Sequence, residues 1–377
     1  MNQQTKTSIA LAPCSSDSER RRHFVSLAGF IRDVRLSIST MANLFIHFGW
    51  DEAAVRSFLH KRSIIRPRPT SSPLEHRSEL VSACATFVCD GVHIRSFGRQ
   101  GSELGELVYP RRCALSVDAC YLYVADSGNH RVCVFDASSG AYRHSFGSQI
   151  FEPMQFHCPV GLFVSDRDQL YVCDSGNHRV QVLDAVTGAY IRTIGTGVSG
   201  SAAVLLYKPV GVVTSRQRVY VCEWGNDRVS VFNESDGAFL HTFSGSGDGQ
   251  FVHCCYIAAS ALSGDVYVVD VSSIYDCRVQ VFSETGEFLR VLCNTKIYGG
   301  LIQSVRGLTV SVTGDVYLVD MLRHCIHIID SSGKHLRSFD SRGIGDRTLS
   351  RCTSVAVSRD GRVFALDQEQ NHVRVFE

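Results

Sequence analysis

The sequence has no run of about 18 consecutive apolar residues, the length a helix needs to cross a membrane, so it predicts no membrane partner. It lacks an uninterrupted apolar segment next to a basic start, so no secretory signal is expected and the expected compartment is cytoplasmic. Neither sign of charge dominates, because 38 lysines and arginines stand against 37 aspartates and glutamates. The net charge of +1 therefore favours no class of partner.

What the sequence does contain is one phrase that recurs six times. YVADSGNHRVCVFD begins at Tyr123, YVCDSGNHRVQVLD at Tyr171 and YVCEWGNDRVSVFN at Tyr220. Looser copies begin at Tyr267, Tyr317 and Phe364. The copies are 47 to 50 residues apart, a period typical of propellers, solenoids and arrays. Apolar residues alternate on both sides of a turn, which is the pattern of a β-hairpin and excludes a helical repeat.

Each repeat holds four short apolar runs. The second repeat shows them most clearly, at residues 160–164, 170–173, 179–183 and 190–194. Four antiparallel strands in a unit of this length predict one blade of a β-propeller, whereas a β-helix would need shorter repeats and parallel coils. The sequence therefore predicts an all-β, six-bladed β-propeller over residues 81–377.

The two ends of the repeated region predict how the ring closes. The last repeat stops at Glu377, directly after its third strand, and so lacks a fourth. GVHIRSFG, from Gly91, precedes the first full repeat and matches the fourth strands that begin at Ala141 and Lys334. We expect this N-terminal strand to complete the last blade, because pairing removes two exposed sheet edges.

Residues 1–80 are predicted to form an N-terminal extension outside the ring. Apolar residues at helical spacing predict a short helical pair over about residues 40–62, followed by a linker rich in proline and serine from Arg66. The alternatives for the pair are packing on the ring, docking of a partner, and disorder. The extension holds 12 basic and 7 acidic residues, so the ring itself has a charge of −4.

The complete repeat resembles the NHL repeat. The resemblance rests on the YVADSGNHRVQVFD-like phrases, on P-V-G at Pro159 and Pro209, and on the glycine-rich stretch GSGDGQF from Gly245. NHL rings of the tripartite-motif and Brat-like families imply protein binding, single-stranded RNA binding on a basic face, and ubiquitin-ligase partners. RING or B-box zinc spacing is absent upstream, so a ligase would have to be supplied in trans.

An acid and an arginine recur on either side of the turn in the first three repeats. The pairs are Asp126 with Arg131, Asp174 with Arg179, and Glu223 with Arg228. A catalytic site needs its groups once and convergent, whereas these recur blade after blade, so we interpret them as structural ion pairs. Ligand binding by the same loops is the alternative.

The turns between these pairs are the candidate binding rim. The rim residues are Asn129, His130, Asn177, His178, Trp224 and Asn226. Trp224 replaces a serine of the sister turns and is either an exposed interface anchor or a packed turn residue. Later repeats depart from the pattern, with three extra residues between Asp270 and Arg278, and with Cys325 and His372 where arginine is expected. Such variation suits an asymmetric partner, or is drift.

Two rival functions remain. Six-bladed lactonases and lyases place carboxylates, Asn or His on the innermost strands, but the runs from Cys113, Val160, Val210, Tyr256, Gly307 and Thr353 contribute neither carboxylate nor Asn. His157 and His253 leave zinc as a weak alternative, as do pairs such as Cys84 with Cys89. RNA binding is disfavoured by the charge of −4, although Arg111, Arg112, Arg131, Arg179 and Arg228 form a possible basic patch.

The 15 cysteines are interpreted as core residues rather than disulfides or ligands. Their number is odd, no C-x-x-C pair occurs, and Cys173 and Cys222 stand where Ala125 stands in a sister repeat. The sequence thus predicts a monomeric, non-enzymatic protein-interaction module with a protein partner. It predicts no catalytic residue, metal or cofactor.

Overall fold

The computed structural model describes residue 89 and residues 91–147, 155–244, 250–295, 301–340 and 349–377. In this part the chain forms six four-stranded antiparallel sheets and two short 3-10 helices, η1 (Ser127–Asn129) and η2 (Ser175–Asn177). This confirms the predicted all-β, six-bladed propeller. The predicted helical pair at 40–62, the linker and the proposed domain boundary at residue 80 lie outside the described residues.

The first three blades follow chain order from the inner strand outward. Blade I consists of β2 (Pro110–Leu115), β3 (Tyr121–Asp126), β4 (Arg131–Asp136) and β5 (Tyr142–Phe146). Blade II consists of β6 (Pro159–Val164), β7 (Gln169–Asp174), β8 (Arg179–Asp184) and β9 (Tyr190–Ile194). Blade III consists of β10 (Pro209–Ser215), β11 (Arg218–Glu223), β12 (Arg228–Asn233) and β13 (Phe239–Phe243).

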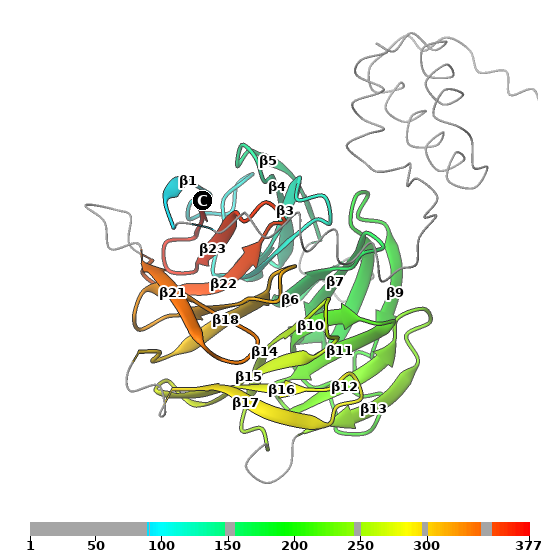
Figure 1. Ribbon diagram of the computed structural model, residues 1–377. Coiled ribbons are helices and arrows are strands. Elements are labelled where there is room, and N and C mark those ends of the chain that lie inside the picture. Colours follow the sequence, from blue (N-terminus) through cyan, green and yellow to red (C-terminus); the bar gives the residue numbers. More distant parts are fainter. Residues whose placement is uncertain (1–88, 90, 148–154, 245–249, 296–300, 341–348) are drawn as a thin grey trace, which may run out of the picture. The chain divides into compact units, whose positions relative to one another are not determined.

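Blades IV and V repeat this order. Blade IV consists of β14 (Cys254–Ala259), β15 (Val266–Ser273), β16 (Asp276–Phe282) and β17 (Phe288–Asn294). Blade V consists of β18 (Val305–Val310), β19 (Val316–Asp320), β20 (Cys325–Ile329) and β21 (His335–Asp340). Figure 1 shows the inner strands at the middle of the ring and β9, β13, β17 and β21 toward its outside.

Blade VI joins the two ends of the ring. It consists of β22 (Cys352–Val357), β23 (Val363–Asp367), β24 (His372–Phe376) and β1 (His93–Phe97). β1 pairs antiparallel with β24, with His93 opposite Phe376 and Phe97 opposite Val373, and it lies beside the C-terminus in Figure 1. The predicted closure by the N-terminal strand is confirmed.

The core lies between blades, because both faces of each blade are buried. Successive side chains of a strand point to opposite faces, so one strand serves two interfaces. In β3, Tyr123 and Ala125 pack against blade II, whereas Leu122 and Val124 pack against blade VI. Six such clusters join the six pairs of neighbouring blades in the described part of the chain.

The cysteines belong largely to these cores. The 13 described cysteines form no disulfide, and ten of them are buried. Burial raises the pKa of Cys113 to about 11 and that of Cys133 to about 12, which keeps both thiols protonated and unreactive at neutral pH. None of the described helices is long and apolar enough to cross a membrane.

Ring closure can be tested with two truncations. We expect deletion of residues 1–80 to leave a cooperatively folding ring. Deletion of residues 1–98 removes β1 and leaves the edge of β24 unpaired, which favours association between molecules. The melting temperature and the solubility should therefore be lower for the longer deletion. Equal melting temperatures and solubility for the two truncations would show that β1 does not close the ring.

Candidate functional site

The repeated motif is built around a buried acid at the end of the second strand of each blade. In blade I this acid is Asp126, which is 0% exposed. It accepts hydrogen bonds from the backbone N–H of Val108 at 2.6 Å, from Nδ2 of Asn129 at 2.8 Å and from Nε of Arg131 at 2.8 Å. One carboxylate thus joins the linker that enters the blade, the turn, and the third strand.

Blades II and III repeat this arrangement. Asp174 accepts from the N–H of His157 at 2.7 Å, from Asn177 at 3.0 Å and from Arg179 at 2.8 Å. Glu223 accepts in the same way from Tyr207 (N–H, 2.9 Å), Asn226 (2.6 Å) and Arg228 (2.7 Å). The three rim asparagines therefore donate inward to an acid.

The last three blades keep the acid even where the sequence departs from the motif. Asp270 still pairs with Arg278, at 2.9 Å across the longer hairpin. Asp320, in the blade without the arginine, accepts from the N–H groups of Gln303 and Ser304 at 2.6 and 3.1 Å. Burial opposes its charge, but hydrogen bonds from His327 and from the backbone N–H groups of Gln303 and Arg323 prevail and lower the pKa of Asp320.

Arg179 tests the contribution of one such pair. Its side chain is 7% exposed, and we expect Arg179→Ala to lower the free energy of unfolding by about 1 to 3 kcal/mol, because Asp174 loses a charged donor but keeps its other donors. Urea denaturation measures the change. The matched control is Arg143→Ala, which removes a short but 51% exposed partner of Asp136 and should cost under about 1 kcal/mol.

An unchanged denaturation midpoint for Arg179→Ala, together with lost partner binding, would assign Arg179 to a binding surface instead.

The last residue of the turn fastens one blade to the next. His130, with a left-handed φ of 54°, accepts the N–H of Cys158 on Nδ1 at 3.0 Å. His178 accepts the N–H of Lys208 at 3.2 Å in the same way, and Asn371 accepts the N–H of Tyr109 at 2.9 Å. Histidine and asparagine both tolerate this backbone conformation and both offer an acceptor to the linker before the next inner strand.

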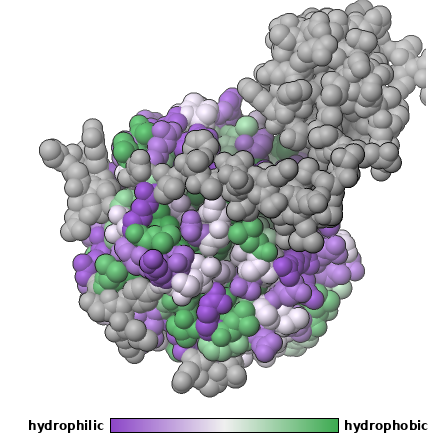
Figure 2. All heavy atoms as spheres, viewed as in Figure 1, coloured by the Kyte–Doolittle hydropathy of each residue, from purple (hydrophilic) through white to green (hydrophobic). Residues whose placement is uncertain are grey.

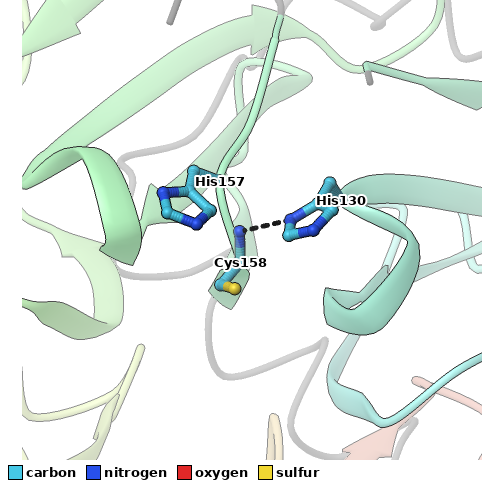
Figure 3. Close-up of side chains that lie close together, drawn as sticks. All are labelled: His130, His157 and Cys158. Carbon is cyan, nitrogen blue, oxygen red and sulfur yellow. Dashed lines mark hydrogen bonds between the residues drawn. The ribbon is translucent and has the colours of Figure 1, made fainter. Parts of the chain in front are cut away.

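His130, His157 and Cys158 form the one group of potential metal ligands of this kind among the described residues (Figure 3). Their ligand atoms lie within 4.8 Å of one another, and imidazole with thiolate is a donor set that Zn²⁺ accepts. However, Nδ1 of His130 already accepts the Cys158 N–H, so the neutral ring carries its proton on Nε2. Burial also raises the pKa of Cys158. Metal binding would have to break the fastening, so these residues fit a metal poorly.

Substitution of His130 separates fastening from metal binding. We expect His130→Asn to keep the melting temperature, since Asn371 performs the same task in blade VI. His130→Ala should lose about 0.5 to 1.5 kcal/mol of stability, measured by urea denaturation, because the N–H of Cys158 loses its acceptor. Added Zn²⁺ should not raise the melting temperature of the wild type. A zinc-dependent rise that His130→Ala and Cys158→Ser both abolish would establish a metal site.

These turns and linkers share one end of the ring, which we call the turn face. It comprises the turns 127–130, 175–178 and 224–227 and the linker residues 108–109, 157–158, 207–208 and 252–253. The linker side chain covers the glycine of the turn: a Cβ on Gly225 would lie 2.3 Å from Cδ1 of Tyr207, so only glycine fits there. The glycine of these three turns is therefore explained by packing against the linker side chain.

The turn face carries an aromatic patch, formed by Tyr207, Lys208, Trp224 and His253. Trp224 is 41% exposed and stacks on His253, with ring centroids 5.4 Å apart. Nζ of Lys208 lies 5.0 Å from the Trp224 ring and 5.7 Å from the Tyr207 ring. On the side seen in Figure 2, apolar and polar residues are interspersed.

The ring axis holds a cavity of about 610 Å³, lined mainly by the inner strands. We call it the channel pocket. The sequence placed the first inner strand from Cys113 onward, but β2 begins at Pro110, so that Arg112 lines the pocket and was missed. The signal was present, because P-R-R at residue 110 replaces the P-V-G of the sister repeats. Carboxylates do occur at the pocket, as Asp166 and Glu234, but in loops beyond the inner strands.

The arginines of the predicted basic patch are not brought together as a surface. Arg131, Arg179 and Arg228 are each held by the acid of their own blade, and Arg112 lines the channel pocket. Arg111 is exposed. His157 and His253 lie at different junctions between blades, and His253 faces Asp227, with Nδ1 3.1 Å from its Oδ1.

Six blades closed by the N-terminal strand define the class of this protein, a six-bladed β-propeller. The family model of the NHL repeat matches residues 156–183, which span the linker, inner strand, turn and third strand of blade II. This match to one repeat, together with the six-bladed ring, supports an NHL-repeat propeller. No curated protein matches the sequence.

Two solved structures resemble the chain in fold. One is titled "Kuenenia stuttgartiensis Hydrazine Synthase", with 15% identity and a TM-score of 0.50, and the match covers 73% of this chain and 97% of that one. The other is a streptogramin B lyase structure, with 12% identity and a TM-score of 0.52, covering 75% of this chain and 86% of that one. At these identities the likeness concerns the fold alone, and a fold does not determine an activity.

Proposed function

We propose that this propeller is a non-enzymatic protein-interaction module and that it binds its partner through the aromatic patch. The observation that carries the proposal is the exposed indole of Trp224, held in place by stacking on His253. Tryptophan and tyrosine are enriched among the residues that dominate binding energy, because they bury a large area with little loss of conformational freedom. A preordered patch of this kind suits recognition by rigid docking.

The chemistry of the patch indicates an acidic segment in the partner. Lys208 is exposed and contributes its ammonium group over two aromatic rings, and it forms no ion pair with the described residues. A partner carboxylate would satisfy that charge while apolar atoms cover Trp224 and Tyr207. The acids of the turn face are unsuitable for catalysis in this proposal, since Asp126, Asp174 and Glu223 are fully buried and hydrogen bonded.

RNA binding is the rival that the same aromatic patch would otherwise favour, because bases stack on aromatic side chains. Phosphate binding, however, needs free lysines and arginines, and three of the candidate arginines are paired with buried acids.

The resemblance to tripartite-motif rings extends the proposal to a ubiquitin ligase. A bound protein would be presented to a ubiquitin ligase that another chain supplies.

Photo-crosslinking tests the proposed surface. A photoreactive residue at position 224 should capture the partner, whereas one at Tyr190, which is 40% exposed on the outer strand β9, should not. With the captured partner purified, Trp224→Ala should raise the dissociation constant about 30-fold, as expected for an interface anchor worth about 2 kcal/mol. Tyr190→Ala should change it by less than about twofold, within the spread of neutral surface substitutions.

Three results would contradict the proposal. Equal losses for Trp224→Ala and Tyr190→Ala would place the interface elsewhere. Crosslinking to RNA, with affinity that falls steeply as salt rises, would make the ring an RNA-binding module. Turnover of a bound small molecule would make it an enzyme.

A further inference from the structure

Arg112 occupies a level of the ring where most blades leave no room for a side chain. It stands two residues after the start of its inner strand, and the equivalent residues are Gly161, Gly211, Tyr256, Gly307 and Ser354. A Cβ on Gly161 would lie 2.7 Å from Sγ of Cys173, and one on Gly307 would lie 2.7 Å from Cγ2 of Val319. Large side chains at this level are therefore confined to Arg112 in blade I and Tyr256 in blade IV.

These two side chains meet across the channel. Cζ of Arg112 lies 3.6 Å from the centroid of the Tyr256 ring. Nη2 of Arg112 donates to the carbonyl oxygen of Cys255 at 2.7 Å and lies 3.5 Å from that of Val210. Blades III and IV thus hold the guanidinium of blade I in place at one end of the channel pocket, which Arg112 lines.

The guanidinium has no counter-ion. Among the described residues no carboxylate pairs with it, and its Nε and Nη1 groups make no hydrogen bond. Burial lowers the pKa of Arg112, and only tyrosine and cysteine side chains act against that effect. The acids of the channel pocket are distant: Asp166 follows the strand residue level with Arg112 by five extended residues, about 17 Å. Arg112 is half-buried, and its charge meets only a carbonyl oxygen and an aromatic ring, so an anion in the channel pocket would supply the missing counter-ion.

The walls between Arg112 and the far opening are apolar. They include Ala114, Leu162, Val212, Ala258, Leu308 and Val355. The far opening is polar and charged, with Asp166, Arg167 and Arg216 among its residues, so the apolar stretch lies between two polar ends. A cavity of about 610 Å³ has the size of a small-molecule site. We propose that the channel pocket binds a small organic anion, a carboxylate with an apolar body, whose carboxylate accepts hydrogen bonds from the free N–H groups of Arg112. This site is separate from the aromatic patch and does not depend on the proposed protein binding.

Decanoate, used below its micellar concentration, probes the site in the full-length protein. We expect one molecule to bind per chain in isothermal titration calorimetry and to raise the melting temperature. Arg112→Gln should weaken binding at least tenfold. The matched control is Arg359→Gln, which removes an exposed arginine of the same pocket and should leave the affinity within threefold. Decanamide, which keeps the apolar body without the charge, should bind at least tenfold more weakly than decanoate.

The folding of each variant is checked first by circular dichroism. Should Arg112→Gln not fold, Arg112→Lys keeps a charge at the site while moving it, and Leu162→Phe narrows the pocket without touching Arg112. Both should then weaken decanoate binding. No binding of decanoate, or equal binding by the wild type and the pocket variants, would overturn the proposal. So would phosphate or chloride binding as tightly as decanoate, because that result would define a site for an inorganic ion.

Discussion

The structure depends on one buried carboxylate per blade. A propeller blade can pack its faces by apolar contact alone, but the linker that enters each blade carries backbone N–H groups that must find acceptors away from water. In each blade the acid at the end of the second strand accepts from this linker, as Asp126 does from Val108 and Asp320 does from Gln303. The same group accepts from the turn or the third strand, so a single side chain fixes three segments.

This constraint explains which parts of the motif vary. Arginine is one of several donors to the acid, and in blade V the acid pairs with backbone N–H groups and His327 instead. The turn glycine occurs in the first three blades, where the linker side chain lies against it, as Tyr207 does against Gly225. The last residue of the turn, histidine in blades I and II and asparagine in blade VI, reaches the following linker. The motif thus encodes junctions between blades more than it encodes a surface for a ligand.

Much of the fold could be predicted from the sequence, because the repeat shows both the alternation of the strands and the point at which each copy begins. The four strands of a blade and the closing strand from Gly91 could be predicted, since each copy checks the others. The role of His130 could not be predicted, because the N–H group that it accepts belongs to the next repeat. The orientation of Asn129 could not be predicted either, because Asp126, its hydrogen-bond partner, had already been paired with Arg131. Arg112 was missed because the start of each inner strand was predicted from its first apolar residues. A charged residue that lines the channel does not fit that pattern.

The departures from the repeat are the places where function can be sought, provided that they leave the acid and its donors intact. Trp224 meets this condition, because Glu223 beside it keeps its bonds to Tyr207, Asn226 and Arg228. Arg112 meets it too, since Asp126 is satisfied by other residues. One departure exposes a large apolar ring on the turn face, and the other places an unpaired charge in the channel pocket. Arg112 does join blade I to blade IV across the channel, but the other blades form their interfaces without such a contact, so we relate both departures to something that the protein binds.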